Sequence, residues 1–363
     1  HRDLHSFPTR RSSDLRAKAT QRIVLQSPFG LHLCIIRSKL ATSYAFLFNY
    51  LAEVKKLPVR GGGKMETLYP VGVVTDSATG IAPELLNTYR IGVVPFPVRI
   101  GTQTFLDGID MTPELMFRLL RAQRQPDVST SMPSIDAFLQ LYQRMAEWAK
   151  GIISIHIAGK QSGTCNAARL AAEASPVPVM VVDTQTTAMA EGFVVLEAAR
   201  AAQKGGTLAE VLQQALAVVP KVEVVALLET VNYAIQGGRL KQAARLLGNL
   251  LSIHPLVRVA ENSVSLVGQV RRYGKGVQQL VDRVIEQAGA MPTHLAVHYS
   301  EDHSLGQTIL DELKQRINCV EAYLSQIPVP LGAHAGPGSV GIATYIEKEQ
   351  KPGLSPLQRL LNR

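Results

Sequence analysis

The sequence predicts an α/β protein of two domains, the first built on a parallel layered sheet and the second on a mixed sheet. Short apolar runs alternate with helical patterns from residue 70 to 219, which favours parallel strands joined by helices. A hairpin pattern at residues 252–267 predicts antiparallel pairing in the second half. With 363 residues and 46% hydrophobic content, the chain is long enough to bury two such cores.

Helix-start signals and apolar runs locate the elements of the first half. Thr112 and Pro113 form a strong helix start, because threonine caps a helix and proline fits its first turn. Thr207 and Glu210 have the spacing of a capping box. We expect strands at 70–77, 92–100, 151–158 and 178–184, the second made irregular by its two prolines, and a polar loop at 127–134. We expect helices starting at 83 and 113, and others at 135–150, 188–204 and 207–219.

The second half has a different pattern. We expect a strand at 222–228, a helical stretch at 231–247 broken by glycines 237 and 238, and a hairpin turning at 261–262. Helices at 275–288 and 304–316 and strands at 293–298 and 320–325 precede a glycine-rich stretch at 332–341. These patterns predict domains at 65–220 and 221–348 and a tail at 349–363.

The net charge of +9 does not indicate a nucleic acid partner, because it is unevenly distributed. The first 64 residues hold 12 of the 38 Lys and Arg and 3 of the 29 Asp and Glu, a net of +9. The rest of the chain is formally neutral, so its composition shows no excess of basic residues for a nucleic acid partner. We therefore exclude nucleic acid as an expected partner.

The first 64 residues are not expected to be native. Residues 1–15 can be back-translated into the end of a common sequencing adapter, and 16–64 read as upstream DNA translated in frame, with a start at Met65. The coding DNA tests this hypothesis. The rival interpretation, a targeting segment around residues 40–54, lacks a clear cleavage site.

Targeting and redox signals predict a cytoplasmic protein without an integral membrane segment. No stretch contains about 18 or more consecutive apolar residues, the length that a spanning helix needs. Cys34, Cys165 and Cys319 have neither metal-ligand spacing nor a disulfide framework, so no metal or cofactor is expected.

Residues 161–171 carry the first candidate site. An apolar strand run ends at Gly159, and an Ala-rich helical pattern starts near Ser162, Gly163 and Thr164. Free amides at a helix start favour an anion, so these residues predict a cradle for a carboxylate or phosphate. The alternative is a capped helix without ligand, in which Ser162 or Thr164 is the cap.

Polar side chains also follow other strands of the predicted parallel sheet. Asp76 and Ser77 end the first strand, and Asp183 ends the fourth. Ligands of such sheets bind at the carboxyl ends of the strands. The two aspartates can equally accept hydrogen bonds from strand-end backbone amides, which we expect to be their main role.

From about residue 71 to 345 the chain resembles the DegV family, fatty-acid-binding proteins of bacterial lipid metabolism. Five motifs carry the resemblance, in order along the chain: Thr75-Asp76-Ser77, Thr130-Ser131-Met132-Pro133-Ser134, Ser162-Gly163-Thr164, Gly237-Gly238-Arg239-Leu240 and His334-Ala335-Gly336-Pro337-Gly338. Each fragment alone is weak, and their order over most of the chain makes the resemblance specific.

The resemblance implies a long-chain fatty acid held between the two domains and no catalytic group in this chain. It also implies an ATP-dependent fatty acid kinase as partner, to which the carboxylate is presented for acyl-phosphate formation. Such a ligand would also bring transient contact with a membrane surface during lipid exchange. The implied carboxylate ligands are Thr130, Ser162, Gly163 and His334. Ser131, Arg239, Asp76, Ser77, Thr164, Asp183 and Gly336 are implied near the site.

Other interpretations of these residues remain open. Thr130 or Ser131 can cap the helix starting at 135, and Arg239 can form a surface ion pair. A serine esterase using Ser162, His334 and Asp183 is the alternative function, although no nucleophile-elbow motif surrounds the serine. A nucleotide-binding enzyme is disfavoured because no phosphate-binding glycine loop is present.

The chain departs from the family pattern at three places. His254 stands before Pro255 where the family pattern has lysine, which removes a permanent charge. The lead residues 159–161 are more polar than usual, and Cys165 replaces an aromatic residue. None of these changes removes an implied carboxylate donor.

Overall fold

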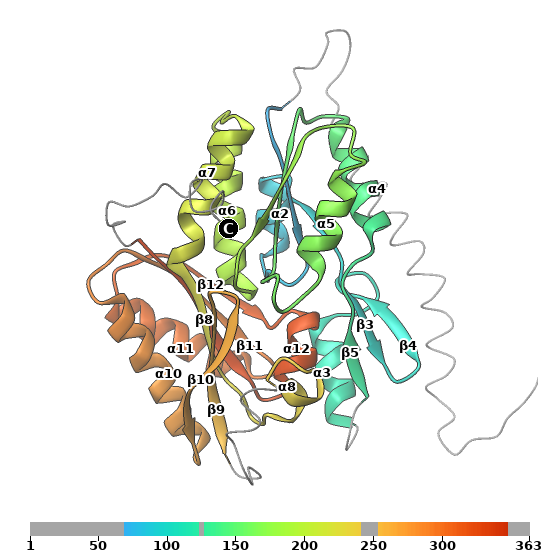
Figure 1. Ribbon diagram of the computed structural model, residues 1–363. Coiled ribbons are helices and arrows are strands. Elements are labelled where there is room, and N and C mark those ends of the chain that lie inside the picture. The colour runs from blue at the N-terminus through green and yellow to red at the C-terminus, as the bar shows by residue number, and fades with distance from the viewer. Residues whose placement is uncertain (1–68, 123–126, 241–252, 348–363) are drawn as a thin grey trace, which may run out of the picture. The chain divides into compact units, whose positions relative to one another are not determined.

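The computed structural model describes residues 69–122, 127–240 and 253–347 (Figure 1). Residues 1–68, 241–252 and 348–363 lie outside the described residues. The expectations for the first 64 residues, for the helix beyond residue 240 and for the tail therefore stay predictions.

Four parallel strands form the predicted sheet of the first half. β1 (Gly72–Asp76), β2 (Gly92–Val94), β6 (Ile152–His156) and β7 (Val179–Asp183) pair in the order β2-β1-β6-β7. Alternate residues of these strands face opposite sides, and α2 (Pro83–Thr88) follows β1. One side packs on α4 (Ile135–Ala146) and α5 (Thr164–Ala172), the other on α6 (Ala188–Gln203) and α7 (Leu208–Val218). The predicted α/β layering is confirmed.

A small antiparallel sheet lies beside the parallel one and corrects two predictions. The apolar run 92–100 is two strands, because Pro95 and Phe96 separate β2 from β3 (Pro97–Ile100). β3 pairs with β4 (Gln103–Leu106) and with β5 (Val128–Thr130). The prediction of a loop at 127–134 was therefore wrong at β5, where pairing with a distant strand gives a short polar segment its β-structure.

The second half forms a mixed six-stranded sheet in the order β10-β9-β8-β13-β11-β12. Its strands are β8 (Val222–Leu227), β9 (His254–Ala260), β10 (Ser263–Val270), β11 (Thr293–Tyr299), β12 (Cys319–Gln326) and β13 (Val340–Ile346). Only the β11–β12 pair is parallel. The predicted hairpin is confirmed, with Glu261 and Asn262 at positive φ in its turn.

The glycine-rich stretch near the end of the described chain contains two elements that the sequence pattern did not predict. α12 (Val329–Ala335) precedes β13, and β13 fills the centre of the six-stranded sheet between β8 and β11. All seven residues of β13 are buried, so the strand lacks the alternation of apolar and polar residues, and its flanking strands come from distant parts of the chain.

α6 connects the two large sheets and positions the cavity described below. It packs against the parallel sheet and against β8 and β13 of the mixed sheet (Figure 1). The opposite face of the mixed sheet is covered by α10 (Tyr273–Ala288) and α11 (His303–Arg316). The predicted domains 65–220 and 221–348 each contain one of these large sheets, and the boundary near residue 220 stays a prediction.

Helix starts follow the predicted chemistry in most places. Thr112 accepts a hydrogen bond from the amide of Leu115 at the start of α3 (Pro113–Ala122), and the capping box of Thr207 and Glu210 is present. Two cap assignments were wrong. Ser134, not Thr130 or Ser131, caps α4, and Gly163 occupies the N-cap position of α5.

Candidate functional site

An apolar cavity lies between the carboxyl ends of the parallel strands and one face of the mixed sheet. Its volume is about 160 Å³. β8 and β9 supply one wall, and the loops after β2, β6 and β7 supply the other. Its aliphatic and aromatic lining includes Phe96, Ile157, Val224, Ala226, Leu228, Leu240, Val257, Val259, Val264, Ile327 and Leu331.

Four polar residues implied by the motifs line this same cavity: Thr130, Ser162, Arg239 and His334. Thr130 ends β5, and His334 lies in the last turn of α12, 204 residues further along the chain. Thr130 Oγ1 and His334 Nε2 are 2.9 Å apart, within hydrogen-bond distance. One strand, two loops and one helix thus bring together groups from four motifs.

His334 is uncharged at neutral pH. Burial, with a smaller effect from the positive charge of Arg239, lowers the pKa of His334 to about 3. Its Nδ1 atom is buried and has no hydrogen-bond partner among the described residues. Gly237 lies against this ring, and a β-carbon at residue 237 would overlap Nδ1. The ring is therefore held by Thr130 on one side and by bare backbone on the other.

Arg239 brings a positive charge to the cavity wall. Its Nη1 atom donates to the carbonyl of Gly237 at 2.6 Å, and burial lowers the pKa of the guanidinium. In the described parts of the chain, no carboxylate forms an ion pair with it. The surface ion pair considered for Arg239 is absent there, and an arginine remains protonated even when partly desolvated.

Ser162, Gly163 and Thr164 form the turn into α5. The hydroxyls of Ser162 and Thr164 share a hydrogen bond of 2.7 Å, and the Thr164 amide points at Ser162 Oγ at 3.4 Å. Gly163 is exposed, and a β-carbon there would overlap the sulfur of Met132. Gly163 lies at the N-terminus of α5 and is not among the residues that line the cavity.

The other residues implied near the site have structural contacts. Asp76 accepts hydrogen bonds from the amides of Ala78 and Ile157. Ser77 accepts from Phe96, Asp183 accepts from Gly159 and Gln185, and Ser131 donates its amide to Pro97. Gly336 has φ of +77° and lies against Tyr233, where a side chain would clash. None of these five residues lines the cavity.

The esterase arrangement is not assembled in the described residues. Ser162 Oγ contacts Thr164, His334 Nε2 contacts Thr130, and Asp183 binds backbone amides and Asn262. A serine, histidine and aspartate do meet elsewhere. His156 lies 2.6 Å from Ser154 and 3.0 Å from Asp76, but all three are fully buried and inaccessible to a substrate.

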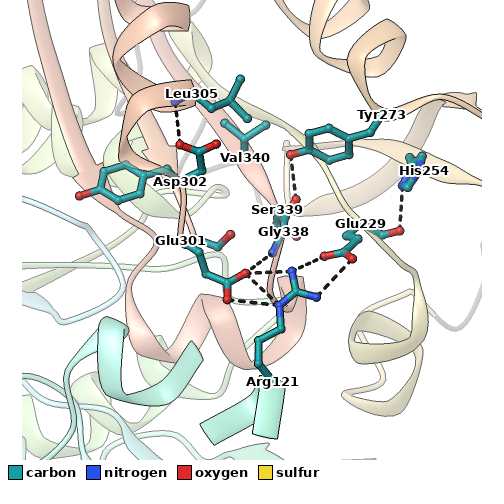
Figure 2. A pocket seen from close by; sticks show the side chains of 12 residues that line it. Arg121, Glu229, His254, Tyr273, Glu301, Asp302, Leu305, Gly338, Ser339 and Val340 are labelled. Atoms are coloured by element: carbon teal, nitrogen blue, oxygen red, sulfur yellow. Dashed lines mark hydrogen bonds and ion pairs between the residues drawn. The ribbon is translucent and has the colours of Figure 1, made fainter. Parts of the chain in front are cut away.

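A second cavity of about 320 Å³ lies beside the first, and Ser339 lines both. Figure 2 shows Arg121, from α3, pointing between Glu229 and Glu301 of the second half. Glu301 also accepts from the amide of Gly338 at 3.1 Å. These hydrogen bonds raise the pKa of Arg121, so it is a permanently charged and fully paired group.

His254, which departs from the family pattern, lines this second cavity. Its Nδ1 atom lies 2.9 Å from the carbonyl oxygen of Glu229 and donates to it. The imidazole therefore holds the backbone beside the Arg121 ion pairs. Cys165, the other departure, is buried and donates to the carbonyl of Ile157.

Comparison with known proteins identifies the chain. A family model described as "Uncharacterised protein, DegV family" matches residues 70–347. The chain belongs to the DegV family. A DegV domain-containing protein of Streptomyces coelicolor is 32% identical over 274 residues, covering 75% of this chain and 97% of the relative. One from Deinococcus radiodurans is 32% identical over 278 residues, with the same two coverages. The family resemblance read from the five motifs is confirmed.

Solved structures agree with the fold. A DegV family protein of Thermus thermophilus, described by its fatty acid binding, superposes with a TM-score of 0.71 at 29% identity, covering 76% of this chain and 99% of that one. A stearic acid-binding protein of Eubacterium ventriosum superposes with a TM-score of 0.70 at 18% identity, covering 76% and 98%, and supports the fold alone. The DegV-like fold prediction is confirmed.

The described ranges, 69–122, 127–240 and 253–347, contain neither a membrane-spanning helix nor a cluster of metal ligands. There, no helix is long and apolar enough to cross a membrane. The same ranges contain no group of three or more His, Cys, Asp or Glu side chains that could hold a metal ion.

Sequence patterns missed most of the cavity lining. Val224, Val257 and Val264 resemble ordinary strand residues. The alternation of side chains along a strand does not indicate which face of the sheet borders a ligand. Thr187, at the start of α6, was also missed. Its only signal is a threonine at a helix start, which normally indicates a cap.

Proposed function

We propose that this protein binds a long-chain fatty acid in the apolar cavity and presents its carboxylate to an ATP-dependent kinase. The observation that supports it most is one cavity whose lining combines aliphatic walls with Thr130, Ser162, Arg239 and His334. A fatty acid has this same division between an apolar chain and an anionic head.

The polar end suits a carboxylate. We assign to the neutral His334 the tautomer with its proton on Nε2, which donates to Thr130 Oγ1 and leaves the threonine hydroxyl proton for a carboxylate oxygen. Ser162 supplies a second hydroxyl, and the Gly163 amide a donor at the N-terminus of α5. His334 thus acts through Thr130, and we propose these hydrogen bonds as the carboxylate clamp, formed by Thr130, Ser162, Gly163 and His334.

Arg239 supplies the charge that the clamp lacks. Taking a carboxylate out of water costs several kcal/mol unless it is paired and hydrogen-bonded. Arg239 is partly buried, remains protonated and has no carboxylate partner among the described residues. It is therefore available to an anionic ligand.

The acyl chain gains free energy from the apolar walls. Each buried methylene contributes about 0.8 kcal/mol, so a chain of sixteen carbons gains roughly 10 kcal/mol before ordering costs. The cavity of about 160 Å³ is below the roughly 300 Å³ at which small-molecule pockets usually begin. Lining side chains must therefore move to admit a full chain.

Presentation to a kinase follows from where the carboxylate would lie. Ser162 is partly exposed and Gly163 is exposed, so a head group bound beside them would be accessible from solvent. A carboxylate oxygen attacks the γ-phosphorus of ATP, the bond to the bridging oxygen breaks, and ADP leaves with that electron pair. The attacking carboxylate needs no base, so this chain has only to hold it in place.

The test begins with protein purified from cells and analysed by native mass spectrometry, which should detect one co-purifying fatty acid. Delipidated protein should then bind a long-chain fatty acid in calorimetry, and its methyl ester at least about tenfold more weakly, since the ester has no charge. Thr130→Val should remove most of this difference. Absence of lipid and of binding, or ester hydrolysis lost in Ser162→Ala, would overturn the proposal.

The kinase step is tested separately. With ATP and a candidate kinase, hydroxylamine should trap the acyl phosphate as a hydroxamate only when this protein is present. If the fatty acid binds but every kinase that phosphorylates fatty acids on other DegV proteins fails here, binding stands and presentation is wrong.

A further inference from the structure

Thr187 brings a hydroxyl without a partner to the lining of the apolar cavity. The residue lines the cavity and is only 8% exposed. It occupies the N-cap position of α6, yet its side chain makes no capping hydrogen bond. Its Oγ1 atom is buried and has no hydrogen-bond partner among the described residues. A buried hydroxyl in this state is unfavourable and uncommon, and a ligand that supplies an acceptor would relieve it.

The polar ring beside the start of α6 does not supply that partner. His298 also lines the cavity, but its Nε2 accepts from the Met189 amide at 3.1 Å and its Nδ1 lies 2.9 Å from Ser325 Oγ. Burial lowers the pKa of His298 to about 4, so the ring is neutral at physiological pH. Both ring nitrogens are therefore engaged, and His298 serves to hold the first turn of α6 in place.

Two backbone hydrogen bonds connect the segment of Thr187 with that of Ser162. The parallel neighbours β6 and β7 end at the same edge of the sheet, and these segments follow them. The amide of Ala158 donates to the carbonyl of Thr186 at 2.8 Å, and the amide of Ser162 donates to the carbonyl of Ala158 at 3.1 Å. Thr187 and Ser162 thus lie at one strand-end edge, and both line the cavity.

The start of α6 also favours an anion. α6 is 16 residues long, and the amides of a first helical turn carry a partial positive charge. Glu191, the acidic residue of this turn, is fully buried. Burial, with a smaller effect from Asp76, raises the pKa of Glu191 well above its ordinary value, which keeps its carboxyl protonated. Glu191 therefore does not neutralise this end of the helix.

We propose that Thr187 Oγ1 donates a hydrogen bond to the carboxylate of the bound fatty acid, beside Ser162, and so is a further ligand-binding residue. This rests on the proposed fatty-acid function and adds a residue to its site. The two oxygens of a carboxylate accept about four hydrogen bonds, so Thr187 adds to Thr130 and Ser162 without displacing them. The hydroxyl and methyl groups of a threonine exchange places by rotation about one bond, so this residue can turn its hydroxyl toward the ligand.

The experiment measures calorimetric binding of stearic acid and of methyl stearate to the delipidated full chain. Thr187→Val keeps the shape of the side chain and removes the hydroxyl. It should weaken binding of the acid at least about tenfold and of the ester less than about threefold, because hydrogen bonds to a charged acceptor are the stronger ones. Thr187→Ser, which keeps a hydroxyl, should bind the acid within about threefold of the wild-type protein.

Thermal unfolding separates a ligand contact from a helix cap. Delipidated Thr187→Val should be at least as stable as the wild-type protein, because valine removes a buried hydroxyl that has no partner in the described structure. Added stearic acid should raise the unfolding temperature less in the variant than in the wild type. Loss of a cap would instead destabilise the delipidated variant and weaken binding of acid and ester alike.

Thr344→Val is the matched control. It removes another buried hydroxyl that has no partner among the described residues, on β13 and outside the cavity lining, and should leave both affinities unchanged. Thr187→Ala also lacks the hydroxyl and replaces Thr187→Val if that variant does not fold.

The ratio of acid to ester affinity decides the proposal. An unchanged ratio in Thr187→Val or Thr187→Ala would overturn it, and so would a destabilised delipidated variant that binds both ligands equally weakly. Failure of the wild-type protein to bind stearic, palmitic and oleic acid would instead refute the underlying fatty-acid function.

Discussion

Arg121 and Arg239 line neighbouring cavities but have opposite surroundings. Arg121 contacts two carboxylates, Glu229 at 2.6 Å and Glu301 at 2.9 Å (Figure 2). Arg239 contacts only the carbonyl of Gly237 among the hydrogen bonds of the described residues, and it faces aliphatic side chains. Each cation borders its own cavity, and within the described residues Arg121 has carboxylate partners whereas Arg239 has none.

This difference in surroundings indicates that the charge of Arg121 is structural and that the charge of Arg239 is available for ligand binding. Arg121 joins α3 of the first half to loops of the second half, so its ion pairs stabilise the contact between them. Leaving Arg239 uncompensated in an apolar wall costs folding free energy, and an anionic ligand recovers it. The contrast predicts that loss of Arg239 affects binding and loss of Arg121 affects stability.

The largest expected effect is on fatty-acid binding in the cavity that Arg239 lines. Gly237→Ala places a methyl group where the His334 ring now lies, which separates His334 from Thr130. We expect fatty-acid affinity to fall roughly a hundredfold, as expected for loss of hydrogen bonds to a charged group. Calorimetry measures it. Gly274→Ala, where an added methyl meets nothing within 4 Å, is the matched control. Unchanged affinity in Gly237→Ala would show that the His334 position is irrelevant.

Arg239→Gln comes next. Removing the uncompensated charge should weaken binding of the fatty acid about tenfold and leave binding of its methyl ester unchanged. A competition assay with both ligands measures the two effects side by side. Equal weakening of acid and ester would mean that Arg239 contributes packing and no charge.

Arg121→Gln should lower the stability of the protein and leave its fatty-acid affinity unchanged. Its side chain is 48% exposed, so solvent screens both ion pairs, and the free energy of unfolding should fall by at most about 1 to 2 kcal/mol. Added salt should reduce this difference between variant and wild type in denaturant titrations. Fatty-acid affinity should not change. A tenfold loss of fatty-acid affinity in Arg121→Gln would show that Arg121, like Arg239, contributes to ligand binding.

The smallest expected effect is the pH dependence of binding. The pKa of His334 is lowered to about 3, against an ordinary value near 6.5, so the ring is neutral above pH 6 in the folded protein. The ligand carboxylate is ionised there and Arg239 is charged. Affinity should therefore change less than about twofold from pH 6 to 8. A decline with a midpoint near 6.5 would show that a charged His334 binds the ligand.

His334 should instead influence stability below that range. The unfolded chain takes up a proton near pH 6.5 and the folded chain not until about pH 3, so stability falls as pH decreases between these values. Above pH 6.5 this contribution is constant. His334→Gln should remove this part of the pH dependence, measured by thermal unfolding.

Local chemistry in the sequence determined much of the fold. The alternation of apolar runs and helices gave the parallel sheet, and residues three apart gave the capping box of Thr207 and Glu210. The hairpin turn at Glu261 and Asn262 was equally readable. Each of these features depends on interactions between residues close together in the chain, so a short stretch of sequence is enough to predict it. The five motifs likewise sufficed to predict the family.

Other features depend on partners far away in the sequence, and only the tertiary structure decided them. β5 and β13 become strands because distant strands pair with them. Thr130 and His334 are 204 residues apart in the chain, yet their side chains lie within hydrogen-bond distance. The two predicted carboxylate ligands therefore interact directly with each other. Within the described parts of the chain, Arg239 has no carboxylate partner and the Thr187 hydroxyl has no hydrogen-bond partner, and both facts depend on the elements that surround these residues. A residue's type is fixed by the sequence, whereas burial and the absence of a partner are set by every element that packs around it.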